Sequence, residues 1–556
     1  MPLMGSIYVG TSGLQTSSNS LNTSAHNLSN IETKGYTRQQ ILQGNRVYNT
    51  IGIASISDMQ VGLGVDYTKC RQVRDVFLDA SYRTENGRSS FYNIFAETTE
   101  EIETLLGEME GASFKETLAK LWTSVQELQK DPSSAVTQGV FVSTCAQFLE
   151  RASAVSDGLN NYQNNLDSRV SGMVDDINDI ADRIHTLNKK IQKFEIGVEE
   201  ANDLRDERNY LIDKLSSMIK VKTVENVDGS VEVYAEGTPL VLGDRVSHLS
   251  VVENKYGFKD VTWGALYDNQ SVFDFHLPIA SEYGTDIGEL KALLIARGDH
   301  RANYSDLEKG ADIYNKGTPG KNDIAVATST VMNTQAEFDR LIHNLATSLN
   351  NVICGNATTG QEATGVEIFQ RLGSNRYEGA DQKGAYITEK INDPMIDPIL
   401  DVSSMYTITN LKINPDLLKQ PTLNSFILDD KSVDFEKAKQ IAEVFAGTAK
   451  VLDLNTNTWK DSSNVINPNL NTKYGFVGFY DGMVGNLANV GSVYESIVSG
   501  QQATVDSLEE SRQQVLGVSS EEELQNIIKF QNAYNASSRY INVINEMLEH
   551  IITQLG

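Results

Sequence analysis

The stretch LQNIIKFQNAYNASSRYINVINEMLEHIITQL, residues 524–555, closes the chain and repeats one helix face at intervals of three and four residues. Such spacing gathers side chains into one narrow seam, the geometry of a helix in a coiled coil. The positions of this C-terminal seam are Leu524, Ile527, Gln531, Tyr534, Ser538, Ile541, Asn545, Leu548, Ile552 and Leu555. Its polar members weaken association but can fix register and partner number, which suits templated assembly better than a monomeric core.

The opening of the chain carries a matching N-terminal seam, formed by Ile7, Leu14, Leu21 and Leu28 at intervals of seven residues. Around these residues the segment up to Asn30 is rich in Ser, Thr, Asn and Gly. Such residues are mediocre or poor helix formers, so a helix of this composition is marginal when isolated. A lone seam cannot bury itself, and we therefore expect the two ends to pack against each other or against equivalent ends of neighbouring copies.

The longest periodic run of the chain lies between the two seams, from Phe141 to Phe194. A helix of that length spans roughly 80 Å, which exceeds a compact domain and fits a rod. One four-residue slip before Val170 is tolerable, because inserted residues rewind a coil only locally. Most amphipathic helices line the core of their own domain, so we favour that interpretation of the run over a coil between molecules.

The remaining segments alternate between helical and β periods. Near Val221 the period changes, and residues 221–224 and 231–234 flank Asp228-Gly229, a strong hairpin signal. Residues 35–66 are expected to form a connector with short strands, and β patterning follows the hairpin to about residue 278. Further helices are predicted at 114–130, 202–219, 287–294, 330–352 and from 435 onward, with Gly517 separating the last two.

These segments predict a mainly α fold with β insertions, in nested discontinuous domains. Terminal coiled-coil helices enclose a long helical rod or bundle, which in turn encloses a β-rich outer domain, so the chain goes out along an axis and comes back. The expected domains are 1–65 with 515–556 for assembly; 66–222, 285–353 and 436–514 for the rod; 223–284 for the β-rich insertion; and 354–435, a mixed insertion whose assignment stays open.

Composition narrows the class of protein. A chain of 556 residues exceeds a single core, and its hydrophobic fraction of 40% without a long apolar run suits a soluble protein without a membrane span. The formal charge of −27 disfavours nucleic acid as a partner. Cys70, Cys145 and Cys354 lie far apart, which indicates neither a zinc site nor a disulfide framework. The first 33 residues have no Lys or Arg and no apolar core, so we expect no classical secretory signal peptide.

No catalytic pattern stands out in the sequence. The metalloprotease, nucleophile-elbow, Walker A, dinucleotide and EF-hand motifs are absent. His248, His276 and His300 lack metal-ligand spacing, and pairs such as Glu199-Glu200 and Asp175-Asp176 fit a solvated helix face. We therefore expect no enzymatic activity, no cofactor and no metal.

Three blocks resemble the family of bacterial flagellar axial proteins. HNLSNIETKGYTRQ, residues 26–39, is similar to the N-terminal signature of that family, although His26 stands where Asn is usual and Ile31 where a small residue is usual. NDLRDERNYLIDKL, residues 202–215, resembles the helix that follows the long coil in the hook-associated members. ELQNIIKFQNAYNAS, residues 523–537, resembles the closing block of the family, with Glu546-Met547-Leu548 after it.

The resemblance implies a structural protein that joins the flagellar hook to the filament as a helical ring of copies. It further implies export by the flagellar type III apparatus without a cleaved signal peptide, a cytoplasmic export chaperone bound to the C-terminal segment, and an extracellular place in the flagellum. The implied partners are further copies of the chain, the hook protein and hook-associated protein 3. Subunit contacts would come from both seams and from Asn27, Asn30, Gly35, Tyr36 and Arg38 of the signature.

Alternatives stay open at this point. Tyr36 and Arg38 could anchor a neighbouring subunit or could stabilise a turn within the chain. The closest rival function is another flagellar axial subunit, from the hook or the distal rod. A rival of another class is a secreted adhesin or enzyme displayed on a coiled stalk, with the β insertion as its active domain.

Overall fold

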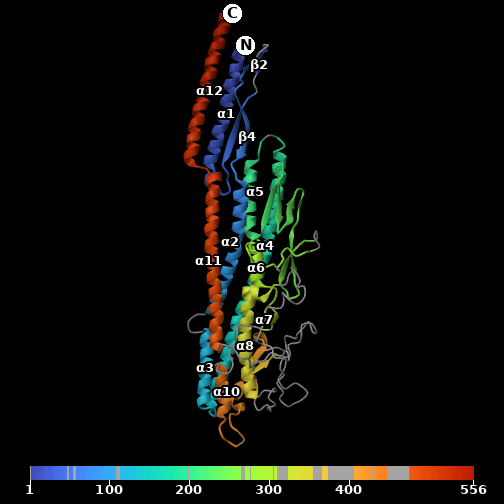
Figure 1. The fold of residues 1–556 in the computed structure, drawn as a ribbon, viewed down its shortest axis with the longest axis vertical. Helices are drawn as coiled ribbons and strands as arrows, with labels where there is room; N and C mark the ends of the chain where they lie inside the picture. The colour runs from blue at the N-terminus through green and yellow to red at the C-terminus, as the bar shows by residue number, and fades with distance from the viewer. Residues whose placement is uncertain are drawn as a thin grey trace.

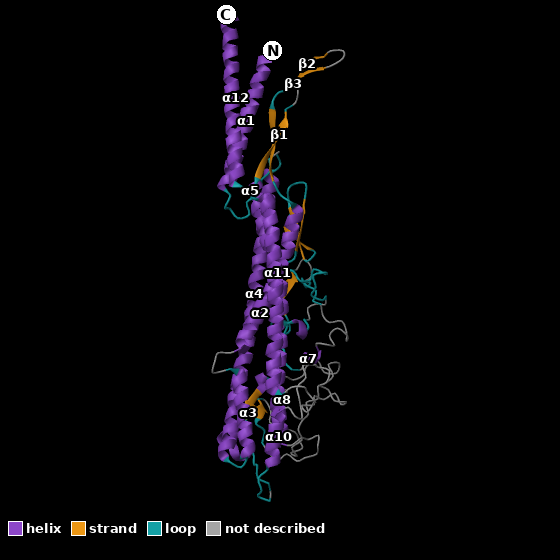
Figure 2. Cartoon of the chain, turned by 60° about the vertical axis from the view of Figure 1, so that its left-hand side comes forward, coloured by secondary structure: helices purple, strands orange, loops and turns teal. Residues whose placement is uncertain are grey.

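The computed structural model describes residues 2–46, 49–53, 58–107, 113–197, 199–264, 269–275, 277–304, 306–309, 324–354, 366–372, 406–428, 430–446 and 475–555. The molecule is long and narrow, with both chain ends at one pole (Figure 1). From that pole the chain runs out along the axis and returns, so that helices distant in sequence lie side by side (Figure 2). The mainly helical, out-and-back architecture predicted from the periodicity is confirmed.

α4 (Ala135–Phe194) is one unbroken helix of 60 residues, about 90 Å long at the rise of an α-helix. The Ser134 side chain caps its start by accepting the backbone N–H of Val136. The apolar stripe of the helix is buried as far as Ile191 against α3 (Phe114–Lys130), α5 (Asn202–Met218) and α6 (Glu289–Arg297). The stripe therefore lines the intrachain core, as predicted, and Cys145 is one of its buried members.

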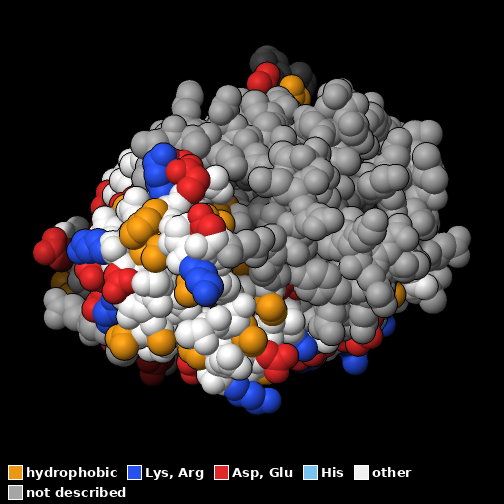
Figure 3. Space-filling model, turned by 90° about the horizontal axis from the view of Figure 1, so that it is seen from below, with side chains coloured by type: hydrophobic (Ala, Val, Ile, Leu, Met, Phe, Trp, Pro, Cys, Tyr) orange, Lys and Arg blue, Asp and Glu red, His pale blue; other side chains and the backbone are white. Residues whose placement is uncertain are grey.

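α2 (Val76–Gly107) and α11 (Phe476–Leu516) pack along each other on the other side of the rod. At the pole away from the termini, α3 meets α8 (Thr330–Cys354), α10 (Phe435–Ala446) and α11. There the Phe114 ring contacts those of Phe148, Phe338 and Tyr480 at centroid distances of 4.9–5.4 Å. Apolar, acidic and basic side chains are interspersed on the described part of this pole (Figure 3).

The β-rich part lies beside α4. β5 (Val221–Glu225), β6 (Val231–Ala235), β7 (Thr238–Leu242) and β8 (Arg245–Val246) form one antiparallel sheet, and β9 (Leu249–Glu253) pairs with β10 (Lys259–Trp263). The predicted hairpin is confirmed, with Val221 opposite Ala235 and Gly229 in its turn at a φ of +79°. Val233 and Leu240 are buried in the core that the sheet shares with α4.

The remaining described helices and strands are short. They are α7 (Asp306–Lys309), η2 (Val326–Thr328), β11 (Phe369–Arg371), η5 (Ile408–Asn410), β12 (Leu411–Ile413), α9 (Pro415–Lys419) and η6 (Pro421–Leu423). β11 pairs with β12 in antiparallel fashion. Much of the mixed insertion, including residues 373–405, lies outside the described residues, as does His276. The domain boundaries stay a prediction.

The terminal part consists of α1 (Pro2–Ser29), α12 (Ser520–Leu555) and the strands between α1 and α2. β1 (Gln39–Asn45) pairs with β4 (Val65–Gln72), and β2 (Asn49–Ile53) pairs with β3 (Asp58–Val61). α1 lies along α12. The break between α11 and α12 falls at Gly517, as predicted; a Cβ there would lie 2.3 Å from the Gln513 carbonyl oxygen, which only glycine avoids.

Candidate assembly interface

The two terminal helices approach each other closely because α1 presents glycine at the contact. A Cβ on Gly10 would lie 2.7 Å from Cγ1 of Ile541, and a Cβ on Gly13 would lie 2.9 Å from Oγ of Ser537. Small residues permit this approach because no side chain separates the two backbones. The predicted pairing of the chain ends is therefore present within one chain.

The N-terminal seam lies at the edge of this contact. Its four members, Ile7, Leu14, Leu21 and Leu28, are all half-buried. The fully buried positions of α1 are small or polar: Gly10, Ser12, Thr16, Ser17, Ser20, Ser24 and Asn27. The periodicity of the leucines could not reveal these positions, because a hydrophobic pattern does not register glycine and serine.

Another side of α1 faces the hairpin of β1 and β4 through hydrogen bonds. The backbone N–H of Val65 donates to Oγ of Ser12 at 3.3 Å, and the Gln43 amide donates to Oγ of Ser20 at 3.1 Å. A Cβ on Gly64, whose φ is +100°, would lie 2.1 Å from that same Ser12 Oγ. The serines of α1 thus have a packing role against a strand.

Asn27 organises the signature loop. Its Oδ1 accepts the Tyr36 hydroxyl at 2.7 Å and the Gln39 backbone N–H at 3.0 Å, and its Nδ2 donates to the Gln39 carbonyl at 2.9 Å. Burial, together with the nearby Asp206 carboxylate, raises the pKa of Tyr36 well above its usual range. Asn30 donates to the carbonyl of His26 at 3.0 Å, which closes the end of the helix. These contacts all lie within one chain.

Arg38 ties the loop to the start of α12. Its guanidinium pairs with Glu522 and with Glu523, each at 2.9 Å, and its backbone N–H donates to the carbonyl of Leu516 at 2.9 Å. The Glu523 side chain is 2% exposed, so loss of Arg38 would leave a buried carboxylate without this ion-pair partner. These contacts support the intrachain role that the sequence left open for Tyr36 and Arg38. Their contact with a neighbouring subunit stays a prediction.

α12 is largely exposed. Of the C-terminal seam, Ile527, Ser538, Ile541 and Leu548 are half-buried, whereas Leu524, Gln531, Tyr534, Asn545 and Ile552 are exposed. The Leu555 side chain lies outside the described residues. The buried apolar residue of the helix is Ile544, which falls one position away from the seam. Further exposed apolar residues are Ile528, Tyr540, Val543, Met547 and Ile551.

The N-terminal half of α5 joins the terminal part to the rod. The Asp206 carboxylate accepts the Thr37 backbone N–H at 3.1 Å and the Gln72 amide at 2.7 Å. Burial raises the pKa of Asp206 to about 6, although its hydrogen bonds with Thr37 act to lower it. Gly35 adopts a φ of +81° and lies against Tyr210, to whose Cβ an added Cβ would approach within 3.0 Å. The sequence block at residues 202–215 predicted this helix, but the partners of Asp206 and Tyr210 are more than 100 residues away and could not be predicted from it.

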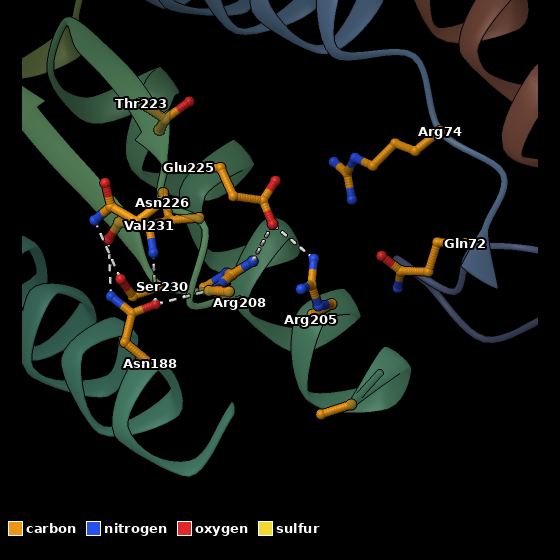
Figure 4. Close-up of polar contacts among 12 residues, drawn as sticks. Gln72, Arg74, Asn188, Arg205, Arg208, Thr223, Glu225, Asn226, Ser230 and Val231 are labelled. Carbon is orange, nitrogen blue, oxygen red and sulfur yellow. Dashed lines mark hydrogen bonds and ion pairs between the residues drawn. The ribbon is translucent and has the colours of Figure 1, made fainter. Parts of the chain in front are cut away.

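The opposite side of α5 holds the tip of the β5–β6 hairpin (Figure 4). Arg208 is 1% exposed and donates to Oδ1 of Asn188 at 3.1 Å and to the carbonyl of Gly229 at 2.6 Å. Arg205 pairs with Glu225 at 2.6 Å and with Glu195 at 2.7 Å. Burial lowers the pKa of Arg208 to about 10, so the buried guanidinium is still charged at neutral pH.

The contacts around α5 form the joint between the terminal part and the rod. Arg512, near the end of α11, adds a third set of contacts to this joint. Its guanidinium pairs with Asp79 of α2 at 2.9 Å and with Asp213 of α5 at 2.7 Å. It also lies 4.2 Å from the ring centroid of Tyr82. Three helices are therefore fixed to one another immediately before the break that leads into α12.

Two of the histidines considered as metal ligands, His248 and His300, lie beside carboxylates. His248 pairs with Asp182 at 3.1 Å, and His300 lies between Asp299 and Asp306. Burial acts to lower the pKa of His300, but hydrogen bonds to both carboxylates outweigh it and raise the pKa to about 9. No cluster of three or more His, Cys, Asp or Glu in the described ranges could hold a metal ion. In the same part of the chain, no helix has the length and apolar character needed to cross a membrane.

Comparison with known proteins agrees with this architecture. The model of the flagellar hook-associated protein FlgK helical domain matches residues 99–369, and that of the flagellar basal body rod FlgEFG protein C-terminal region matches residues 512–555. The chain is 25% identical over 543 residues to flagellar hook-associated protein 1 of Bacillus subtilis, covering 96% of this chain and 95% of the relative. It is 22% identical over 578 residues to the protein of that name from Salmonella typhimurium, covering 97% and 98%.

Among solved structures, the fold is similar to the flagellar hook junction protein FlgK from Burkholderia pseudomallei. The TM-score is 0.50 and the sequence identity 12%, with 80% of this chain and 100% of that chain covered. Paired terminal helices that close an out-and-back helical rod, together with these matches, define a flagellar axial structural protein. Within that class, the relatives that match over nearly the whole chain are flagellar hook-associated protein 1, and this homology indicates a structural protein of the junction between hook and filament.

Proposed function

We propose that this chain forms the hook–filament junction by self-assembly through α1 and α12. The observation that carries the proposal is the exposure of α12. Of the apolar side chains that the structure describes on this helix of 36 residues, Ile544 alone is buried. Exposed apolar surface on this scale marks an interaction site, because leaving it in water is unfavourable.

Folding and assembly of the terminal part would be coupled. α12 packs mainly on α1, and where the two helices meet α1 presents Gly10 and Gly13, which have no side chain to bury. We propose that this pair is weakly held in the free chain and becomes rigid when it docks beside neighbouring copies. An end of this kind is also readily unfolded for passage through a narrow channel.

The partners that we propose are further copies of the chain, the hook protein and hook-associated protein 3. We also propose export by the flagellar type III apparatus without a cleaved signal peptide. A cytoplasmic chaperone would cover the exposed apolar residues of α12 before export. The name of the matched family supports association with the hook. The exposed apolar residues of α12 support the proposal of a chaperone that shields them before export.

We propose that the role is structural and not enzymatic. With a pKa of about 9, the His300 imidazole is protonated at neutral pH and held between two carboxylates, so it is unsuited to act as a free base or metal ligand. The rival in which the β insertion is a displayed enzyme or adhesin would require activity or ligand binding from residues 223–284. A glycan-binding or turnover signal that depends on that insertion would favour the rival.

The function is tested in a flagellated strain that lacks its own copy of the gene. The strain should carry hooks without filaments and release flagellin into the medium, and the intact chain should restore filaments. An epitope-tagged chain should label a short band at the end of each hook in electron micrographs. Label spread along the hook, or along the rod, would instead favour another axial subunit.

A shortened chain of residues 65–515 serves as the second arm of the test. It retains the rod helices α2 to α11 and their buried core, so we expect it to fold and stay monomeric. We expect it to restore no filaments, because both terminal helices are missing. Restoration of motility by the shortened chain would contradict assembly through these helices.

A further inference from the structure

We infer that His300 is the centre of a pH-sensitive clasp, which holds α7 and the backbone at Ile324 against the rod and opens when the imidazole loses its proton. The clasp is defined by His300, Asp299 and Asp306. Asp299 and His300 follow α6, and Asp306 begins α7. Ile324 is the first described residue after α7, so the clasp joins described residues on either side of 310–323.

Both ring nitrogens of His300 face carboxylate oxygens. Nδ1 lies 2.5 Å from Oδ1 of Asp299, and Nε2 lies 3.4 Å from Oδ2 of Asp306. The protonated ring has an N–H on both nitrogens, whereas the neutral ring has one N–H and one lone pair. Loss of the proton therefore sets a lone pair against one of the two carboxylates. The side chains of His300, Asp299 and Asp306 are 18%, 12% and 8% exposed, so water screens this repulsion only in part.

The two carboxylates extend the clasp to the backbone of the segments that it joins. Oδ2 of Asp299 accepts the backbone N–H of Ile324 at 3.3 Å, and Oδ2 of Asp306 accepts that of Asn303 at 2.9 Å. Leu307 of α7 packs on a small buried apolar cluster that is separate from the main core and consists of Val326, Met332 and Ala336. A cluster of this size buries little apolar area, so the clasp decides whether this segment stays closed.

The backbone around the clasp is anchored by other groups. The carbonyl of His300 accepts Nε2 of Gln163, on α4, at 2.9 Å. The Asp339 carboxylate, on α8, accepts the backbone N–H of Tyr304 at 3.1 Å. These contacts do not depend on the proton of the imidazole. Opening is therefore confined to the side chains of the clasp and to the segments that its carboxylates hold, while α4 and α8 stay in place.

The other charged groups near the clasp are directed elsewhere. The Tyr256 ring, on the turn between β9 and β10, lies 5.1 Å from the imidazole, centroid to centroid. Three cations have partners of their own: the Lys255 ammonium lies over the Tyr256 ring at 4.7 Å, Arg297 of α6 pairs with Asp167 at 2.6 Å, and Arg301 donates to Asn164 at 3.4 Å. Of the described groups, the two clasp carboxylates are therefore the charges in contact with the imidazole.

The proton on His300 is held into the alkaline range. Burial acts to lower the pKa of His300, but the hydrogen bonds and charges of Asp299 and Asp306 raise it to about 9. An open clasp returns the imidazole to its ordinary pKa of about 6.5. Because the closed form has the higher pKa, stabilisation by the clasp is full below about pH 6.5 and is lost as the pH rises through about 9. Linkage between these values predicts that the opening equilibrium increases about a hundredfold from about pH 6 to about pH 9.

NMR and hydrogen exchange of the full-length chain test the clasp. The chain is produced with histidine isotopically labelled in the ring, and the His300 signal is identified as the one of seven that is missing in His300→Gln. We expect this signal to titrate with a midpoint near pH 9. Over the same range, peptides from 299–309 should exchange about a hundredfold faster after correction for the intrinsic effect of pH, while peptides from α4 keep their protection.

Three variants separate the clasp from a general effect of pH. Asp306→Asn removes one carboxylate, so the midpoint of His300 and the opening should both move to lower pH by about one unit. In His300→Gln, which has no imidazole to titrate, opening should no longer depend on pH. His248→Gln is the matched control, because His248 pairs with Asp182 at the exposed surface, and it should leave both curves unchanged.

Three results would overturn the inference. The first is a midpoint of His300 near its ordinary value of about 6.5. The second is a midpoint near pH 9 without faster exchange in residues 299–309. The third is opening that keeps its dependence on pH in His300→Gln. If that variant does not fold, the signal that moves in Asp306→Asn identifies His300, and the first two results still decide.

Discussion

Replacing Ile544 by alanine should open the pair of terminal helices while leaving the rod intact. Ile544 is 3% exposed and is the buried apolar residue of α12. Truncating a buried isoleucine to alanine costs about 2–5 kcal/mol, and we expect about 2–3 kcal/mol because the open sides of a two-helix pair can relax around the gap. At 1.4 kcal/mol for each factor of ten, that loss multiplies the opening equilibrium of the pair by roughly 30 to 150.

Amide hydrogen exchange followed by mass spectrometry measures this opening segment by segment. Peptides from α1 and α12 should exchange faster in Ile544→Ala by the factor above, whereas peptides from α4 should be unchanged and serve as the internal reference. The native pair is weakly protected under the proposed function, so exchange is followed from the millisecond range. Terminal helices that are fully protected in the free native chain would contradict coupled folding and assembly.

The matched control is Asn545→Ala, at the next position of the helix. Asn545 belongs to the seam predicted from the sequence, but its side chain is exposed. Its replacement should change the free energy of opening by no more than about 0.5 kcal/mol. Faster exchange in Asn545→Ala with none in Ile544→Ala would mean that α1 packs on the seam and not on the face that contains Ile544, which would refute the geometry.

Three further predictions concern the terminal contact and the joint. Gly10→Ala should weaken the pairing of α1 with α12 through crowding, whereas Gly5→Ala, with no atom near its added carbon, should stabilise α1 by about 0.5–1 kcal/mol; circular dichroism and exchange of the two variants compare them. Asp206 has a pKa of about 6 in the folded chain, above its unfolded value, so it favours folding below pH 4 and this contribution should be lost between about pH 4 and pH 6. The loss should amount to about 2–3 kcal/mol relative to Asp206→Asn in urea titrations across that range, and a gain of stability with rising pH would contradict it. Arg512→Met should lower the stability of the rod by about 2–4 kcal/mol, more than Arg512→Lys, because it leaves buried carboxylates short of a partner; an unchanged melting temperature would refute this.

Regular helices were predictable because their signal is local. The stripe from Phe141 to Phe194 repeats for fifteen turns, and burial of such a stripe within its own domain is the usual outcome for an amphipathic helix. The β5–β6 hairpin was equally predictable from Asp228-Gly229 between alternating strands. Gly517 marked the end of α11 because a residue with a Cβ does not fit there.

The details of the terminal contact were not predictable in the same way. Hydrophobic periodicity selects leucine and isoleucine, whereas the closest approach of α1 to α12 is made by Gly10 and Gly13, which carry no such signal. The position of Ile544 one residue from the seam follows from which side of α12 the glycines contact. The role of Asp206 depends on Thr37, 169 residues earlier in the chain, and such a partner comes from the fold and not from local spacing.

The joint around α5 explains how the terminal helices, whose pairing is weak under the proposed function, can be attached firmly to a stiff rod. Asp206 fixes the connector on one side of the helix, Arg208 fixes the hairpin tip on another, and Arg512 fixes α11 at the third. Polar and charged contacts of this kind are directional, so they define an orientation more strictly than apolar packing does. The apolar side chains of α12 are instead exposed, and under the proposed function a neighbouring copy would bury them. Under the proposed function, a chain built in this way would hold its terminal helices in a set direction from the rod and leave the exposed apolar surface of α12 for contacts in the junction.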